Sequence, residues 1–96
     1  ADENMISAGK EYSKCLGLAF QLTDDVLDVK GDEKLLGKKT GSDDLNDKAT
    51  YVKIFGLEET ENKAKEQVNR AISVIDKFPN TEILIKIAES VINRIN

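Results

Sequence analysis

Residues 17–28, GLAFQLTDDVLD, are the part of the chain that says most about its fold and its chemistry. On a helix of about 3.6 residues per turn, one amide and three carboxylate side chains of this stretch fall within one arc of about 100°: Gln21, Asp24, Asp25 and Asp28. Most of the remaining circumference is apolar, as in a helix that is buried in a helical protein. Three carboxylates on one face of such a helix need an explanation, because they repel one another and lose hydration on burial.

Outward from this stretch, the spacing of apolar residues is helical along the chain and predicts an all-α protein. We expect helices at about residues 3–30, 48–55, 57–78 and 81–95. Glycine suits the position after a helix, so Gly31 with Asp32 is expected to end the first helix. Residues 31–47 then form a glycine-rich, charged loop, and a loop of this length in a compact domain is often functional.

Two amphipathic helices are predicted to pack the core. Their apolar stripes are Leu57, Ala64, Val68, Ala71, Ile72, Ile75 and Phe78 in one, and Leu84, Ile87, Ala88, Val91 and Ile95 in the other. Pro79 with Asn80 separates them. The single cysteine, Cys15, lies among apolar residues of the first helix and is interpreted as a small core residue.

Composition excludes several classes of function. The chain has no histidine, which excludes Ser-His-Asp catalysis and most zinc sites. Its net charge of −4 argues against a nucleic-acid partner. There is no apolar run of the roughly 20 residues that a membrane span needs, and no signal peptide. A reducing cytoplasmic location fits a chain that has no cysteine pair.

Two interpretations of the acidic arc remain open from the residues alone. Either the arc faces water, or it lines a cavity in which a cation neutralises it. Mg²⁺ prefers carboxylate oxygens and bridges to substrate phosphates. Gly17 lies in the same arc, one turn before Gln21, and would leave room for a substrate. Lys38 comes later, on the glycine-hinged loop, and Lys48 comes at the start of the next expected helix, and lysine can bind phosphate as a point charge.

The order of motifs resembles the second aspartate-rich region of the trans-prenyl diphosphate synthases, the family of geranyl, farnesyl and geranylgeranyl diphosphate synthases. The matching strings are Gly17-Leu18-Ala19-Phe20-Gln21, Asp24-Asp25-Val26-Leu27-Asp28, Gly37-Lys38, Gly41-Ser42-Asp43 and Lys48-Ala49-Thr50-Tyr51. The bacterial short-chain type, similar to farnesyl diphosphate synthase, is the most similar. The resemblance implies the C-terminal helices of the isoprenoid synthase fold.

The resemblance also assigns roles to residues. Asp24, Asp25 and Asp28 match the acids that bind Mg²⁺ and, through it, the allylic diphosphate, with Asp24 as the most direct ligand. Lys38 and Lys48 match lysines that contact that diphosphate. The substrate-binding set is completed by Phe20, Gln21 and Thr50, and Asp24, Lys38 and Lys48 form the catalytic set.

The implied activity is that of a transferase of isoprenoid biosynthesis, which condenses an allylic diphosphate with isopentenyl diphosphate. The family works with a first aspartate-rich helix that is not found in these 96 residues. We therefore expect the C-terminal part of a polyprenyl synthase domain, inactive alone, with the N-terminal half supplied in cis or in trans and a homodimer as the full-length enzyme. The alternative is a non-catalytic helical interaction or regulatory subunit of a heteromeric prenyltransferase.

Overall fold

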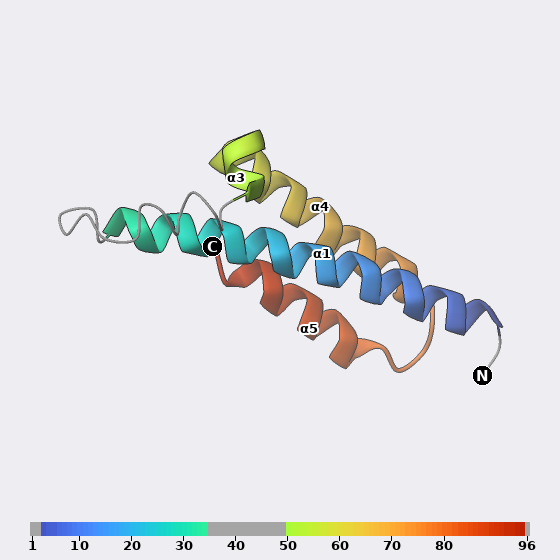
Figure 1. The fold of residues 1–96 in the computed structure, drawn as a ribbon. Coiled ribbons are helices and arrows are strands. Elements are labelled where there is room, and N and C mark those ends of the chain that lie inside the picture. The colour runs from blue at the N-terminus through green and yellow to red at the C-terminus, as the bar shows by residue number, and fades with distance from the viewer. Residues whose placement is uncertain (1–2, 35–49, 96) are drawn as a thin grey trace.

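A computed structural model describes residues 3–34 and 50–95 of the chain. All regular secondary structure in these two ranges is helical (Figure 1), which confirms the predicted all-α class for this part of the chain. The helices are α1 (Glu3–Lys34), α3 (Thr50–Phe55), α4 (Leu57–Ile75) and α5 (Glu82–Asn93). Among the residues described, no helix has both the length and the apolar character that crossing a membrane requires.

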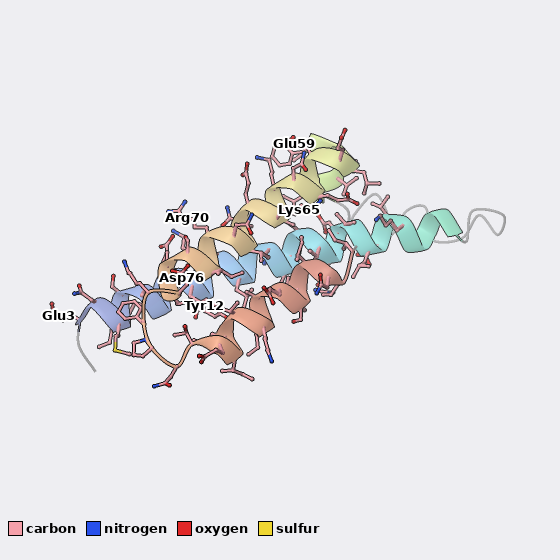
Figure 2. The ribbon with its side chains drawn as sticks, turned by 180° about the vertical axis from the view of Figure 1, so that it is seen from behind. Glu3, Tyr12, Glu59, Lys65, Arg70 and Asp76 are labelled. Carbon is pink, nitrogen blue, oxygen red and sulfur yellow. The ribbon has the colours of Figure 1, made fainter. Side chains whose placement is uncertain are left out.

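The two helices α4 and α5 both pack along the long helix α1 (Figure 1). α4 runs antiparallel to α1, since Lys30 Nζ lies 3.0 Å from Glu61 Oε2 and Arg70 Nε lies 3.1 Å from Glu11 Oε2. α5 runs parallel to α1, and the short α3 lies at the start of α4. The bundle is elongated, with extents of 53 × 20 × 19 Å. Charged side chains such as those of Glu59, Lys65 and Asp76 project from its outer surface (Figure 2).

The core has a spacing of three and four residues on each helix. Its buried side chains are Tyr12, Cys15, Ala19, Leu22 and Val26 of α1, Ala64, Val68, Ala71 and Ile75 of α4, Ala88 and Val91 of α5, and Ile95 just beyond α5. This spacing is that of helices that cross at a small angle with interlocking side chains. The alanines among them are fully buried and let the helices approach closely.

These burials test the predicted packing residues. The buried position of Cys15, at 3% exposure, confirms its assignment to the core. In the stripe predicted for α4, the central residues are buried and confirm the prediction: Ala64, Val68, Ala71 and Ile75. In α5, Ala88 and Val91 are buried, whereas Ile87 is 44% exposed and lies at the edge of the stripe. Tyr12 adds a polar contact to this core, because its hydroxyl donates a 2.8 Å hydrogen bond to the carbonyl of Leu84.

The predicted end of the first helix was wrong. α1 continues through Gly31 to Lys34, four residues beyond the expected end at about residue 30. A glycine inside a helix costs only about 1 kcal/mol relative to alanine, and Gly31 does not adopt the positive φ that ends a helix. Most of the predicted loop at residues 31–47 lies outside the described residues.

The remaining helix ends are close to prediction. α3 is described over Thr50–Phe55, and residues 48–49 of the predicted helix lie outside the described residues. Gly56 separates α3 from α4 with a φ of 86°, a conformation that favours glycine. α4 ends at Ile75, three residues earlier than expected, because the chain already turns before Pro79 and Asn80 has a φ of 62°. Differences of one or two residues, as at both ends of α5, are ordinary for helix boundaries.

Candidate functional site

The acidic segment lies in the C-terminal half of α1, where α3 and the end of α5 both approach it. Asp25 is the buried member, with 9% of its surface exposed. Its Oδ2 accepts a hydrogen bond of 2.9 Å from the backbone N–H of Tyr51. Tyr51 is the second residue of α3, and the first N–H groups of a helix have no acceptor within it. Asp25 therefore caps α3 and points away from the open side of α1.

Asp24 contacts a different element, the end of α5. Its Oδ1 forms an ion pair with the guanidinium of Arg94, the residue that follows α5. Arg94 Nη1 also donates a 3.1 Å hydrogen bond to Thr23 Oγ1, and its guanidinium lies 4.3 Å from the centre of the Phe20 ring. The planar fork of arginine suits such a combined contact. The Asp24 side chain keeps 46% of its surface exposed, so it remains accessible.

Gly17, Gln21 and Asp28 complete the open side of this segment. All three are exposed, and Asp28 comes one helical turn after Asp24, which places their Cβ atoms about 5–6 Å apart. A Cβ built on Gly17 would meet nothing within 4 Å. The space beside Gly17, two helical turns before Asp24, is therefore open, and whether a substrate uses it remains a prediction. We call Gly17, Gln21, Asp24 and Asp28 the acidic face.

The acidic face can supply part of a magnesium site. Within residues 3–34 and 50–95, no three side chains of the metal-binding types converge on one point, and one oxygen of Asp25 is engaged by the Tyr51 N–H. Asp24 and Asp28 remain as two neighbouring oxygen donors. Mg²⁺ is usually held by one or two carboxylates together with water and substrate phosphates. The residues present thus fit Mg²⁺ in the company of a phosphate ligand.

The other predicted site residues differ in how far the structure describes them. Phe20 is 49% exposed and lies beside the acidic face, where it contacts Arg94. Thr50 is the first residue of α3, and its side chain lies outside the described part. Lys38 and Lys48 also lie outside the described residues. Their contacts with a diphosphate remain predictions.

Sequence reasoning missed Arg94 and Thr23. Thr23 is fully buried, and its Oγ1 donates a 3.0 Å hydrogen bond to the carbonyl of Phe20 while it accepts one from Arg94. The residues three and four positions before Arg94, Val91 and Ser90, are not acidic, so its own helix offers no ion pair at that spacing. The sequence does not indicate which residue of another helix Arg94 contacts.

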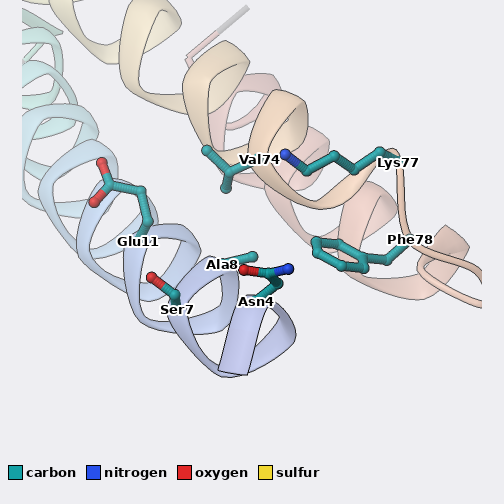
Figure 3. Close-up of a pocket in the computed structure, with 7 residues that line it drawn as sticks. All are labelled: Asn4, Ser7, Ala8, Glu11, Val74, Lys77 and Phe78. Atoms are coloured by element: carbon teal, nitrogen blue, oxygen red, sulfur yellow. The ribbon is translucent and has the colours of Figure 1, made fainter. Parts of the chain in front are cut away.

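A separate hollow of about 610 Å³ lies at the opposite end of the bundle (Figure 3). It is formed where the start of α1 faces the end of α4 and the turn after it, and its lining is Asn4, Ser7, Ala8, Glu11, Val74, Lys77 and Phe78. Glu11 is already paired with Arg70. None of the predicted site residues lines this hollow, so its geometry does not bear on the acidic face.

Comparison with known proteins places these features in context. The family model described as polyprenyl synthetase matches residues 1–91. The chain is 37% identical over 93 residues to farnesyl diphosphate synthase of Haemophilus influenzae, covering 97% of this chain and 32% of that protein. It is 41% identical over 97 residues to geranylgeranyl diphosphate synthase of Cyanophora paradoxa, covering 100% and 32%. The chain thus spans about a third of the length of these relatives. No solved structure matches it.

Proposed function

This chain belongs to the polyprenyl synthetase family, and we propose that it supplies an aspartate-rich magnesium–diphosphate site to a prenyltransferase. The enzyme would condense an allylic diphosphate with isopentenyl diphosphate, as a short-chain synthase of the farnesyl or geranyl type. One observation carries the proposal. Asp24 and Asp28 lie one turn apart on the open side of a helix whose other side is buried, and the open space at Gly17 lies on the same side, two turns before Asp24.

In this proposal, Asp24 and Asp28 hold Mg²⁺ through their carboxylate oxygens, and Asp25 contributes by fixing the start of α3. The ion, when bound, neutralises the charge that develops on the departing diphosphate. Gln21 offers an amide beside the acids, and Phe20 offers an apolar ring that shields the allylic carbon from water. Lys38, Lys48 and Thr50 are proposed, from the family pattern, to contact the diphosphate oxygens.

The remaining groups of the reaction are proposed to come from outside these 96 residues, in cis or in trans. The chain covers 32% of the relatives from Haemophilus and Cyanophora, and the resemblance assigns it one of the two aspartate-rich sites. A homodimer is proposed for the full-length enzyme, and activity is not expected from the 96 residues alone.

A condensation assay tests the proposal. The full-length protein is incubated with radiolabelled isopentenyl diphosphate, dimethylallyl diphosphate and Mg²⁺, and the labelled product is extracted. Asp24→Asn is expected to lower turnover by about 100-fold or more, because a ligand that stabilises developing charge is lost. Asp76→Asn is the matched control, since Asp76 is an exposed carboxylate at the end of α4. Wild-type turnover in Asp24→Asn would contradict the proposal.

A non-catalytic partner subunit is the second candidate, and the surface of α5 favours it. Ile83 is 65% exposed and Ile87, one turn later, is 44% exposed, which leaves an apolar strip on this helix. Exposed apolar strips often mark protein contacts. Analytical ultracentrifugation combined with calorimetry separates the candidates. The subunit would bind another chain without binding diphosphate and Mg²⁺, whereas the enzyme would bind the diphosphate only when Mg²⁺ is present.

A further inference from the structure

Arg94 brings a full positive charge to the carboxylate that is the foremost candidate for a metal ligand. Its guanidinium pairs with Asp24 Oδ1 from the end of α5, 70 residues further along the chain. We propose that Arg94 and a divalent cation compete for Asp24. The cation concentration at which the acidic face becomes occupied then depends on Arg94, at the end of α5. This proposal rests on the proposed function, because it takes Asp24 as a cation ligand.

Competition is expected from charge. The single carboxylate of Asp24 carries one negative charge, and the guanidinium already neutralises much of it. A cation bound to the same carboxylate would lie within a few ångströms of the guanidinium, and like charges at that distance disfavour each other. Asp28 lies one turn away, but no contact of Arg94 with Asp28 is found in the described part of the chain. The competition is thus centred on Asp24.

Arg94 can leave Asp24 without unfolding α5. The backbone at the end of this helix is fixed independently, because Ile95 is 7% exposed and its carbonyl accepts a 3.3 Å hydrogen bond from Lys30 Nζ. The guanidinium also contacts the Phe20 ring and the Thr23 hydroxyl, and these partners remain to it if Asp24 turns to a cation. The Arg94 side chain is 28% exposed, so water can reach it when it moves. A side-chain rearrangement is therefore sufficient.

Two other roles for Arg94 make different predictions. A purely structural clamp between α5 and α1 would affect stability and leave cation affinity unchanged. A supporting role, in which Arg94 orients Asp24 for the metal, would make cation binding weaker when Arg94 is removed. Competition alone predicts tighter cation binding when Arg94 is removed.

The experiment measures Mn²⁺ binding to the full-length protein by the loss of the electron paramagnetic resonance signal of free Mn²⁺, since Mn²⁺ shares the ligand preference of Mg²⁺. Arg94→Gln is expected to lower the midpoint of the Mn²⁺ titration by a factor of about three to five, the effect of removing one partly exposed charge. Arg94→Lys, which keeps the charge but not the fork, should lie between Arg94→Gln and the wild type. Arg70→Gln removes the ion pair with Glu11, far from the acidic face, and should leave the midpoint unchanged.

An unchanged or higher midpoint in Arg94→Gln, measured on protein shown to be folded by circular dichroism, would overturn the inference. If Arg94→Gln does not fold, a midpoint in Arg94→Lys equal to that of the wild type would overturn it in the same way. Failure of the proposed function is recognised separately through Asp24→Asn. If that variant binds Mn²⁺ as tightly as the wild type, Asp24 is not a ligand, and the site assignment fails whatever Arg94 does.

Discussion

Asp25 Oδ2 accepts a 2.9 Å hydrogen bond from the backbone N–H of Tyr51, which joins the acidic segment of α1 to the first turn of α3. Asp24, its neighbour in the sequence, is paired instead with Arg94 at the end of α5. Successive residues of a helix point about 100° apart, so these adjacent carboxylates reach different elements. This division of partners underlies the different roles proposed for the two aspartates.

The cap formed by Asp25 can be tested by stability. Asp25→Ala removes the acceptor and leaves the Tyr51 N–H without its partner, which is expected to lower the free energy of unfolding by about 1–3 kcal/mol. Asp25→Asn keeps an oxygen that can accept the same hydrogen bond and should cost less than Asp25→Ala. Urea denaturation monitored by circular dichroism measures both. Equal losses in the two variants would show that the negative charge, not the hydrogen bond, is what matters at this position.

Gly17 is expected to show opposite effects on stability and activity. Gly17→Ala places a methyl group where nothing lies within 4 Å, and alanine favours the helix by up to about 1 kcal/mol. The same methyl group would narrow the open side of α1 two turns before Asp24, where the proposed substrate lies, and is expected to lower turnover. Gly9→Ala is the matched control, because Gly9 lies on the same helix and also meets nothing within 4 Å. It should stabilise the protein with unchanged turnover. Equal turnover in both variants would mean that no substrate lies beside Gly17.

Tyr12 ties α1 to α5 through its hydroxyl. Tyr12→Phe removes the 2.8 Å hydrogen bond to the carbonyl of Leu84 while it keeps the buried ring. The expected loss is about 1 kcal/mol in the free energy of unfolding, as for one intramolecular hydrogen bond. The midpoint of urea denaturation measures it. An unchanged midpoint would mean that water replaces the tyrosine hydroxyl at Leu84.

Stability is expected to fall at alkaline pH. Burial raises the pKa of the Cys15 thiol above the ordinary 9.0, with a hydrogen bond to Glu11 as the next cause. Burial also raises the pKa of Tyr12. Both groups are uncharged when protonated, so folding favours the protonated form. Their contribution is complete below the pKa values of the unfolded chain and is lost as pH rises through the folded values.

The predicted fall in stability with rising pH is tested by urea midpoints measured between about pH 8 and 11, because free thiol and phenol groups ionise in that interval. Cys15→Ala should reduce the slope, since it removes the thiol but leaves Tyr12. Stability that rises across this interval in the wild type would contradict the assignment.

Much of the fold could be predicted from the sequence, because the buried residues of α1, α4 and α5 repeat at helical spacing. The end of α1 could not, because a glycine such as Gly31 ends a helix only where the backbone turns to positive φ, and that turn depends on how the next residues of the chain pack. Gly56 does adopt that conformation. Residue type alone therefore does not show that Gly56 separates two helices while Gly31 lies within one.

The candidate site was predictable in part. The arc of Gln21, Asp24 and Asp28 is a consequence of helical spacing, and its exposed side is present in the structure. The buried hydrogen bond of Asp25 and the ion pair of Arg94 depend on which helices lie on either side of α1. The first contact joins residues that are 26 positions apart, and the second joins residues that are 70 positions apart. No local pattern encodes them.

The most direct test compares turnover in Asp24→Asn and Asp25→Asn of the full-length protein, in the condensation assay with Mg²⁺. If Asp24 holds the cation and Asp25 caps α3, Asp24→Asn loses about 100-fold or more in turnover. Asp25→Asn then loses at least about tenfold less, because its oxygen still accepts the hydrogen bond from Tyr51. Equal losses would contradict the division of roles between the two carboxylates. Wild-type turnover in Asp24→Asn would contradict the magnesium–diphosphate site itself.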